Sequence, residues 1–440
     1  MTTSAERDAI LAAVDAAFDE QLDFTAALIA IPSLRGEEND GQDFMEQAFR
    51  EVGLDIDRWT LDPAELATHP GAGAVAVSYE NTDVVVGTLE PAAAVGAAVG
   101  RSLILNGHVD VVPLGSPRLW SRSPWEPAIE DGWMYGRGSG DMKAGLAANV
   151  FALRALQRAG LTPRGRIHLQ SVPEEESTGN GTLSALQHGY TADAVLITEP
   201  SSNAVVRAHT GVIWFRVVVT GRAAHASEMS VGANAIDGAY AVIAELRRME
   251  ADWNTRVPES AHFAEQPHPL NLNIGTIRAG DWPSSVPDAC ELGIRVALLP
   301  EMDVEECWEE IVERVQRAVQ VDPALAGATA LTEKLGFFSD GYVLEPGSDA
   351  EAVLAAAHEQ ATGSALGEVA MPGYIDSRCY GLFAGVPALV YGPLGERLHG
   401  ADERVNIESV RHVTKAVALF IAEWCGVEAA PATGQSDNLD

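Results

Sequence analysis

The chain has 440 residues, of which 47% are apolar and 21% are charged. This length is too great for one ordinary domain and sufficient for two, and the composition excludes a disordered or fibrous chain. Acidic residues outnumber basic residues 63 to 29, which gives a net charge of −34. Because so acidic a chain repels phosphate groups, we expect no nucleic-acid partner and no anionic membrane surface.

The four cysteines are scattered and form no C-x-x-C pair. This pattern argues against a disulfide scaffold and against a thiolate metal site. The first 20 residues lack a basic segment followed by a long apolar one, and no run reaches the roughly 18 apolar residues that a membrane span needs. These features predict a protein of the reducing cytoplasm.

The first half of the chain alternates between helical and strand-like segments. The periodicity of apolar residues predicts helices over 4–30, 42–52, 142–159 and 181–187, and strands over 73–79, 83–89, 102–106, 166–171 and 194–198. Between two of these strands, residues 91–100 predict a hairpin tip or loop. The alternation favours an α/β layer fold.

The pattern changes after Gly211 and returns beyond Gly347. The middle stretch predicts strands over 212–220, 271–277 and 290–298 and helices over 233–249 and 304–319. Its content suits an α+β sandwich of about 120 residues. The final stretch predicts a helix over 350–362, a strand over 388–391 and a helix over 409–425. We therefore predict a discontinuous α/β domain of residues 1–211 and 338–440, with residues 212–337 inserted as a second domain.

His108 and Asp110 follow an apolar strand and fall on one face of it, because side chains alternate along a strand. A carboxylate two residues away can hold the second nitrogen of a metal-binding histidine. Such a pair is more often structural, so it is weak evidence when it is taken alone.

Asp141 follows three closely spaced glycines and begins a predicted helix. It suits a helix N-cap, which is the simpler interpretation. The glycines also leave room for its carboxylate to reach a cation. The spacing does not fit a phosphate-binding loop.

Acidic residues follow two further predicted strands: Glu174, Glu175 and Glu176 after the first and Glu199 after the second. An acidic run is most often a solvated surface. However, ligands of open α/β sheets bind where strands end, and acids crowded there repel one another unless a cation or a shared proton compensates.

Two more histidines complete the candidate set. His225 lies among small residues in the predicted insert, and His399 lies in a loop after the last predicted strand. Imidazole and carboxylate groups without a thiolate suit Zn²⁺, Mn²⁺ or Co²⁺. The set at the ends of the α/β elements is large enough for two ions with one shared carboxylate; its members are His108, Asp141, Glu175, Glu176, Glu199 and His399.

The chain resembles the di-zinc amidohydrolase and exopeptidase family of acetylornithine deacetylase, succinyl-diaminopimelate desuccinylase, aminoacylase and the glutamate-releasing carboxypeptidases. The motifs that carry the resemblance are Gly107–Asp110, Gly136–Lys143 with Gly145, Glu174–Gly181, Thr198–Pro200, Gly221–Ser227 and His399–Glu403. The resemblance implies a mixed-sheet α/β catalytic domain of the phosphorylase/hydrolase-like class. It also implies that the inserted α+β sandwich is a lid and dimerisation domain, and hence that the protein is a homodimer.

The resemblance further implies a pair of divalent metal ions, with zinc as the first candidate and cobalt or manganese as alternatives. Asp141 would bridge the two ions. His108 and Glu199 would complete one site, and Glu176 and His399 the other.

Catalytic roles follow from the same resemblance. Glu175 would be the general base that takes a proton from a metal-bridged water, which then attacks an amide carbonyl as hydroxide. Asp110 would orient the first histidine ligand, and His225, from the same or the partner subunit, would donate to the oxyanion. The family usually has Asp-Glu-Glu where this chain has three glutamates, so Glu174 and Glu175 could exchange roles.

Four residues are implied to bind substrate: Arg295 and Asn234 of the insert, and Asp376 and Arg378 of the segment 373–378. The two arginines would hold a substrate carboxylate, or would serve equally well as structural ion-pair partners. Segment 373–378 has Tyr and Ile where relatives have small residues. This difference leaves room for a bulkier or aromatic substrate group.

Together these observations predict an enzyme that hydrolyses a linear amide bond in an N-acylated amino acid or a similar small molecule. A dipeptidase or carboxypeptidase of the same family is the alternative within the same chemistry. A non-catalytic metal-binding or ligand-binding protein on the same fold is the alternative of a different class.

Overall fold

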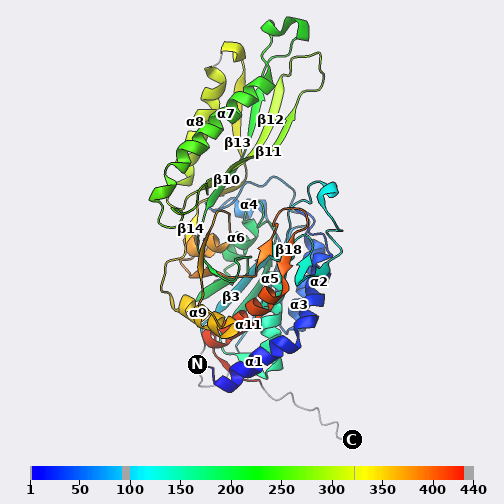
Figure 1. Cartoon of the computed structure of the whole chain (residues 1–440), viewed down its shortest axis with the longest axis vertical. Coiled ribbons are helices and arrows are strands. Elements are labelled where there is room, and N and C mark those ends of the chain that lie inside the picture. The colour runs from blue at the N-terminus through cyan, green and yellow to red at the C-terminus, as the bar shows by residue number, and fades with distance from the viewer. Residues whose placement is uncertain (1, 92–99, 322, 431–440) are drawn as a thin grey trace.

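The computed structural model describes residues 2–91, 100–321 and 323–430, which form two bodies of unequal size (Figure 1). The larger body contains both ends of the described chain, and the smaller body, at the top of the view, contains α7, α8 and β10 to β13. Most of the loop expected at 91–100 lies outside the described residues. The mixed α/β architecture predicted from the sequence is confirmed.

A six-stranded mixed sheet forms the centre of the larger body, in the order β1-β2-β7-β3-β8-β16. Its strands are β1 (Asp55–Thr60), β2 (Asp83–Leu89), β7 (Ile167–Val172), β3 (Leu103–His108), β8 (Ala194–Ile197) and β16 (Ala388–Val390). The last four run parallel, whereas β1 and β2 are antiparallel to their neighbours. The parallel strands are fully buried because helices cover both faces of the sheet.

Alternate residues of β3 contribute to two different cores. Leu103 and Leu105 pack with α5 (Ala144–Arg158) and α11 (Ile407–Trp424), whereas Ile104 packs on the other face near α10 (Ser377–Phe383). The remaining helices of this body are α1 (Ser4–Ala16), α2 (Phe18–Ile29), α3 (Asn39–Glu51), α4 (Pro63–Leu66), α6 (Asn180–Gln187) and α9 (Asp349–Thr362).

Two of the expected elements are wrong in detail. The helix predicted over 4–30 is broken at Ala17, which separates α1 from α2. Residues 73–79 do not form a strand, because their backbone groups bond outside a ladder: Asn180 Oδ1 accepts from Gly73 N at 2.9 Å, and Gly336 O accepts from Ala74 N at 2.8 Å. Strand β1 was not predicted, since all six of its residues are exposed or partly exposed and no buried apolar face marks it.

The smaller body is a four-stranded antiparallel sheet covered by two helices. The strand order is β11-β12-β10-β13, and the elements are β10 (Gly211–Thr220), β11 (Leu272–Ala279), β12 (Ala289–Leu298), β13 (Thr329–Ser339), α7 (Ala235–Asn254) and α8 (Val304–Gln320). Phe215, Leu246 and Leu292 lie in its own hydrophobic core. This body occupies the stretch expected for the insert, with β13 continuing to Ser339; the domain limits 1–211, 212–337 and 338–440 stay a prediction.

Three small sheets join loops to the larger body. They are β14-β9-β15 (Tyr342–Val343, Val205–His209 and Glu368–Met371), β17-β18-β5-β4 (Gly395–Glu396, Arg404–Asn406, Trp133–Tyr135 and Ala128–Glu130) and β19-β6 (Val427–Ala429 and Leu161–Pro163). The second of these places the β17–β18 loop beside the turn before α5. Within the described ranges, no helix is both long enough and apolar enough to cross a membrane.

Gly145 sets the distance between α5 and the end of β8. An added Cβ would lie 2.2 Å from the carbonyl oxygen of Thr198, closer than real contacts allow. We expect Gly145→Ala to push the helix from the strand and lower the free energy of unfolding by about 1–3 kcal/mol, as overpacking does. Thermal and urea unfolding measure this change. Gly373→Ala is the control, because no described atom lies within 4 Å of its added Cβ; equal stability of both variants would contradict the prediction.

Candidate functional site

The predicted acidic and imidazole groups gather where three parallel strands end. His108 is the last residue of β3, the acidic run 174–176 follows β7, and Glu199 follows β8. Because β7, β3 and β8 are adjacent and parallel, their carboxyl ends lie at one edge of the sheet. The position of these residues therefore results from the topology.

Asp141 lies between the two histidines. Its Oδ1 is 3.1 Å from His108 Nε2, and its Oδ2 is 3.3 Å from His399 Nε2. The carboxylate belongs to the turn Ser139–Lys143 before α5. Each carboxylate oxygen thus faces a different imidazole, which is the arrangement that a bridging ligand requires.

A buried ion pair holds the turn that carries Asp141. Glu403 Oε1 accepts hydrogen bonds from Gly140 N at 3.0 Å and Asp141 N at 3.1 Å, and Glu403 Oε2 accepts from Arg137 Nη1 at 2.5 Å. The side chains of Arg137 and Glu403 are each 1% exposed. Sequence reasoning assigned no role to either residue, because they are far apart in the chain and neither is a metal ligand.

His399 lies in the loop between β17 and β18, and its backbone φ is 61°. Its Nε2 is 3.1 Å from each carboxylate oxygen of Glu176. Its side chain is 53% exposed, whereas that of His108 is 1% exposed. The second imidazole therefore lies at the rim of the site and the first at its base.

The other acids surround His108. Glu199 Oε1 is 3.1 Å and Glu175 Oε2 is 3.9 Å from His108 Nε2. Two compact groups of ligand atoms result, His108 with Glu175 and Glu199, and His108 with Asp141 and Glu176. The structure thus brings together all five predicted metal ligands and the predicted base, although the compact groups differ from the two predicted ligand sets.

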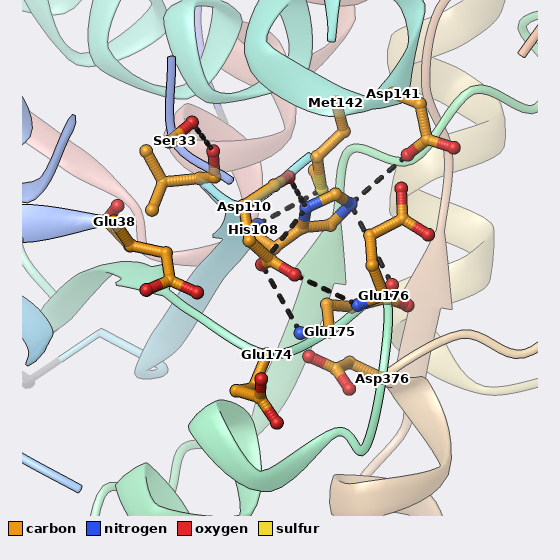
Figure 2. A network of polar contacts seen from close by, with 12 residues as sticks. Ser33, Glu38, His108, Asp110, Asp141, Met142, Glu174, Glu175, Glu176 and Asp376 are labelled. Carbon is orange, nitrogen blue, oxygen red and sulfur yellow. Dashed lines mark hydrogen bonds and ion pairs between the residues drawn. The ribbon is translucent and has the colours of Figure 1, made fainter. Parts of the chain in front are cut away.

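Asp110 supports both His108 and the acidic turn, as Figure 2 shows. Its carbonyl oxygen is 2.9 Å from His108 Nδ1 and its carboxylate 3.5 Å away, so the carbonyl is the closer acceptor. An acceptor at Nδ1 favours the proton there and leaves Nε2 directed at the acids. The carboxylate accepts from Glu175 N at 3.3 Å and from Glu176 N at 3.1 Å.

Glu174 differs from its two neighbours, because cationic and hydroxyl groups compensate its charge. Its carboxylate accepts from Arg35 Nη2 at 2.9 Å, Tyr79 Oη at 2.8 Å and Thr178 Oγ1 at 2.9 Å, and it also pairs with Arg35 Nε. Glu174 is fully buried and points away from His108 in Figure 2. Sequence reasoning missed Arg35 and Tyr79, which lie 139 and 95 residues from Glu174.

The remaining acids have only histidines as cationic partners. Among the described residues, no lysine or arginine forms an ion pair with Asp141, Glu175, Glu176 or Glu199. Burial and the Asp141 charge raise the pKa of Glu199 to about 8, and burial raises the pKa of Glu175. The Glu176 carboxylate raises the pKa of His399 to about 11.

Burial alone would raise the pKa of Asp141, but its hydrogen bonds and charge interactions with His108 and His399 hold it below its usual range. Two imidazoles and four carboxylates, of which two are buried and two partly buried, form a donor set without a thiolate that suits borderline divalent cations such as Zn²⁺. The residues therefore fit a bound pair of divalent ions, which would compensate the mutual repulsion of the acids.

A cavity of about 640 Å³ opens beside these groups. Asp141, Glu175, Glu176, Glu199 and His399 line one side of it, and residues of the smaller body line another. Glu174 does not line it. A reacting group in this cavity would therefore contact Glu175 rather than Glu174.

Of the predicted substrate-binding residues, one lines the cavity and the others do not. Arg295 lines the cavity, its side chain forms no hydrogen bond or ion pair with another described residue, and burial lowers its pKa. Asp376 is buried close to the acidic turn, where Thr182 Oγ1 donates to it at 2.6 Å and Tyr374 Oη at 2.8 Å. Arg378 is buried against the rings of Tyr374 and Phe383 and does not line the cavity.

Two residues of the insert lie outside this cavity. Asn234 is the N-cap of α7, where its Oδ1 accepts from Ile236 N and Asp237 N. His225 lies in an exposed loop with its Nδ1 2.7 Å from Ser227 Oγ. The structure does not bring either side chain to the acids, and their functional roles stay predictions.

Comparison with known proteins matches residues 104–423 to a family described as peptidase family M20/M25/M40. A protein of Halalkalibacterium halodurans named N-formyl-4-amino-5-aminomethyl-2-methylpyrimidine deformylase is 28% identical over 443 residues, which cover 96% of this chain and 98% of that protein. An acetylornithine deacetylase of Proteus mirabilis is 27% identical over 77% of this chain and 83% of that protein.

Solved structures of other proteins have a fold similar to that of this chain. The dipeptidase Dug1p of Saccharomyces cerevisiae has a TM-score of 0.78 at 14% identity, with 96% of this chain and 99% of that chain covered. Human carnosine dipeptidase 1 has a TM-score of 0.75 at 15% identity, with 95% and 98% covered. The family match spans most of the chain, and the predicted resemblance is confirmed. The chain belongs to peptidase family M20/M25/M40 and is a hydrolase of that family.

Proposed function

We propose that this protein is a dimetal deacylase that hydrolyses the linear amide bond of an N-acylated amino acid or a similar N-acylated small molecule. The observation that carries the proposal is the position of Asp141, whose two carboxylate oxygens face His108 and His399 separately. The names of the curated relatives support acyl transfer to water, since one is a deformylase and another a deacetylase.

His108, Glu199 and Asp141 would hold one ion, and His399, Glu176 and Asp141 the other, with zinc as the first candidate and cobalt or manganese as alternatives. When bound, such ions lower the pKa of a coordinated water and polarise a substrate carbonyl. The protein's own residues hold the acids in place. Asp110 fixes His108 and the acidic turn, and Glu403 fixes the turn of Asp141.

Glu175 would be the general base. It lines the cavity, lies 3.9 Å from His108 Nε2, and has its pKa raised by burial, so its carboxyl group can both accept and return a proton. It would take a proton from the attacking water and deliver it to the departing amine nitrogen. Glu174 is a poor candidate, because Arg35, Tyr79 and Thr178 occupy its carboxylate.

Arg295 would hold an anionic group of the substrate. Its guanidinium lines the cavity without any acidic partner among the described residues. A carboxylate of an N-acyl amino acid would supply two parallel hydrogen bonds to it. Asp376 would support the base from behind the acidic turn. Arg378 and Asn234 would bind substrate only in a closed or dimeric form of the protein.

A dipeptidase is the second candidate, because two of the most similar solved structures are dipeptidases by name. One panel separates the candidates: N-formyl, N-acetyl, N-succinyl and N-aroyl amino acids against unblocked dipeptides, with release of free amine as the readout. Faster turnover of the N-acyl compounds supports the deacylase. Faster turnover of the dipeptides would replace it by the dipeptidase.

Removal of the ions should stop hydrolysis. We expect a chelator to abolish release of amine and Zn²⁺ or Co²⁺ to restore it, because four closely spaced carboxylates have no lysine or arginine partner in the described chain. Metal analysis before and after dialysis measures the loss. Full activity in protein that contains no divalent metal would disprove the dimetal proposal.

Glu175→Gln should retain the metal and the fold yet lower kcat by about 10²–10⁴-fold, the usual contribution of a general base. Glu174→Gln is the matched neighbour, since it breaks the ion pair with Arg35 and should mainly reduce the free energy of unfolding. Activity assays, metal analysis and thermal unfolding compare the two. Near-normal turnover of Glu175→Gln would exclude that residue as the base.

His225 would reach the oxyanion from the partner subunit of a homodimer that forms through the insert, because in one chain it lies away from the cavity. We expect His225→Ala to keep its metal and lose about 10²-fold or more in kcat. Mixing this variant with Glu175→Gln should restore part of the activity through mixed dimers. An unchanged rate of His225→Ala would remove the oxyanion role.

A further inference from the structure

Three aromatic side chains line the cavity together with the acids. They are Trp214 of β10, Phe337 of β13 and Tyr374 of the loop before α10, in the cavity that Asp141 and Glu175 also line. We call these three rings the aromatic wall. Two of them come from the smaller body and one from the larger body, so the wall joins both sides of the cavity.

An irregularity in the β10–β13 ladder produces this wall. Ile213 pairs with Phe338, but the next pair is Phe215 with Lys334. Trp214 alone therefore faces three residues, 335–337, in a bulge. Bulges next to active sites redirect side chains that a regular ladder would place elsewhere.

Gly336 allows the bulge to lie against the acidic turn. Its φ is +80°, and an added Cβ would lie 2.7 Å from the carbonyl oxygen of Ser177. Both conditions favour glycine. The bulge that carries two rings of the wall is thus in direct contact with the turn of the proposed base.

The rings of the aromatic wall are fixed relative to one another. Trp214 and Phe337 have ring centroids 5.2 Å apart at 87°, and Phe337 and Tyr374 have centroids 4.3 Å apart at 41°. Tyr374 Oη donates to Asp376 at 2.8 Å, which anchors its ring. Edge-to-face and tilted contacts of this kind are those that aromatic groups favour.

We propose that the aromatic wall is a subsite for a planar aromatic ring of the substrate. The inference rests on the proposed amide hydrolysis and adds the substrate class: N-acylated small molecules in which a ring lies on the amine or the acyl side of the scissile bond. A ring that enters the cavity extends the existing series of aromatic contacts, and its quadrupole interacts with theirs, which a saturated ring of similar size cannot do.

Three substrates with equal charge test the subsite: N-acetylphenylalanine, N-acetylcyclohexylalanine and N-acetylalanine. We expect kcat/KM to be about 10-fold higher for the phenyl than for the cyclohexyl compound, the effect of an aromatic pair beyond burial of area, and to be lowest for alanine. N-benzoylalanine tests the acyl side in the same way against N-cyclohexanecarbonylalanine. Equal rates for phenyl and cyclohexyl compounds in both series would overturn the proposal.

Two adjacent phenylalanines of β13 give matched variants. Phe337 lies in the aromatic wall, whereas Phe338 is directed to the other face, where it contacts Trp308 and Lys334. Phe337→Leu should remove most of the phenyl-over-cyclohexyl preference, measured as the ratio of the two kcat/KM values, because the ring contact is lost. Phe338→Leu should keep the preference. The proposal fails if both variants change the preference equally, which is the outcome expected of rings that merely join the two bodies.

A binding measurement separates failure of this inference from failure of the proposed function. Calorimetric titration of the wild-type protein with phenylacetate and with cyclohexylacetate requires no turnover and no variant. Tighter binding of phenylacetate supports the subsite even if no amide in the panel is hydrolysed, a result that would refute the deacylase alone. Equal binding of the two acids would refute the subsite whatever the enzyme hydrolyses.

Discussion

Repulsion among closely spaced, largely enclosed carboxylates is the constraint on which the rest of this structure depends. Asp141, Glu175, Glu176 and Glu199 converge on two imidazoles, and no lysine or arginine of the described chain pairs with them. A fold keeps such a cluster when surrounding groups hold each acid and a cation or a shared proton compensates the repulsion. The hydrogen bonds and ion pairs around the site meet this requirement.

Those surroundings use backbone groups and compensated charges rather than direct cationic partners. Asp110 accepts from two backbone amides of the acidic turn, and Glu403 accepts from two backbone amides of the Asp141 turn. Arg35 and Arg137 each pair with an acid outside the cluster, namely Glu174 and Glu403. The positive side chains thus stabilise the scaffold of the site while the inner acids stay available for divalent ions.

The sequence was sufficient to predict the mixed α/β fold from local periodicity, and strand-end positions together with the family resemblance identified the acids and histidines that converge. Strand ends followed by polar residues are visible in the chain, and His108, Glu175 and Glu199 follow directly from the parallel order of β7, β3 and β8. Arg35 and Arg137 were not predictable, since their acidic partners are 139 and 266 residues away. Trp214 and Phe337 of the aromatic wall were equally hidden, because they come together only where the β10–β13 ladder is irregular.

The backbone hydrogen bond between Ala74 and Gly336 connects the larger body to the insert. Ala74 N donates to Gly336 O at 2.8 Å, and the same glycine touches Ser177. The segment 73–79, which lacks regular structure, is thereby attached through two adjacent residues to both bodies: Gly73 N donates to Asn180 of α6, and Ala74 N donates to the insert. A movement of the insert away from the larger body would have to break this main-chain hydrogen bond, which joins the two bodies beside the acidic turn in addition to the chain connections near residues 211 and 339.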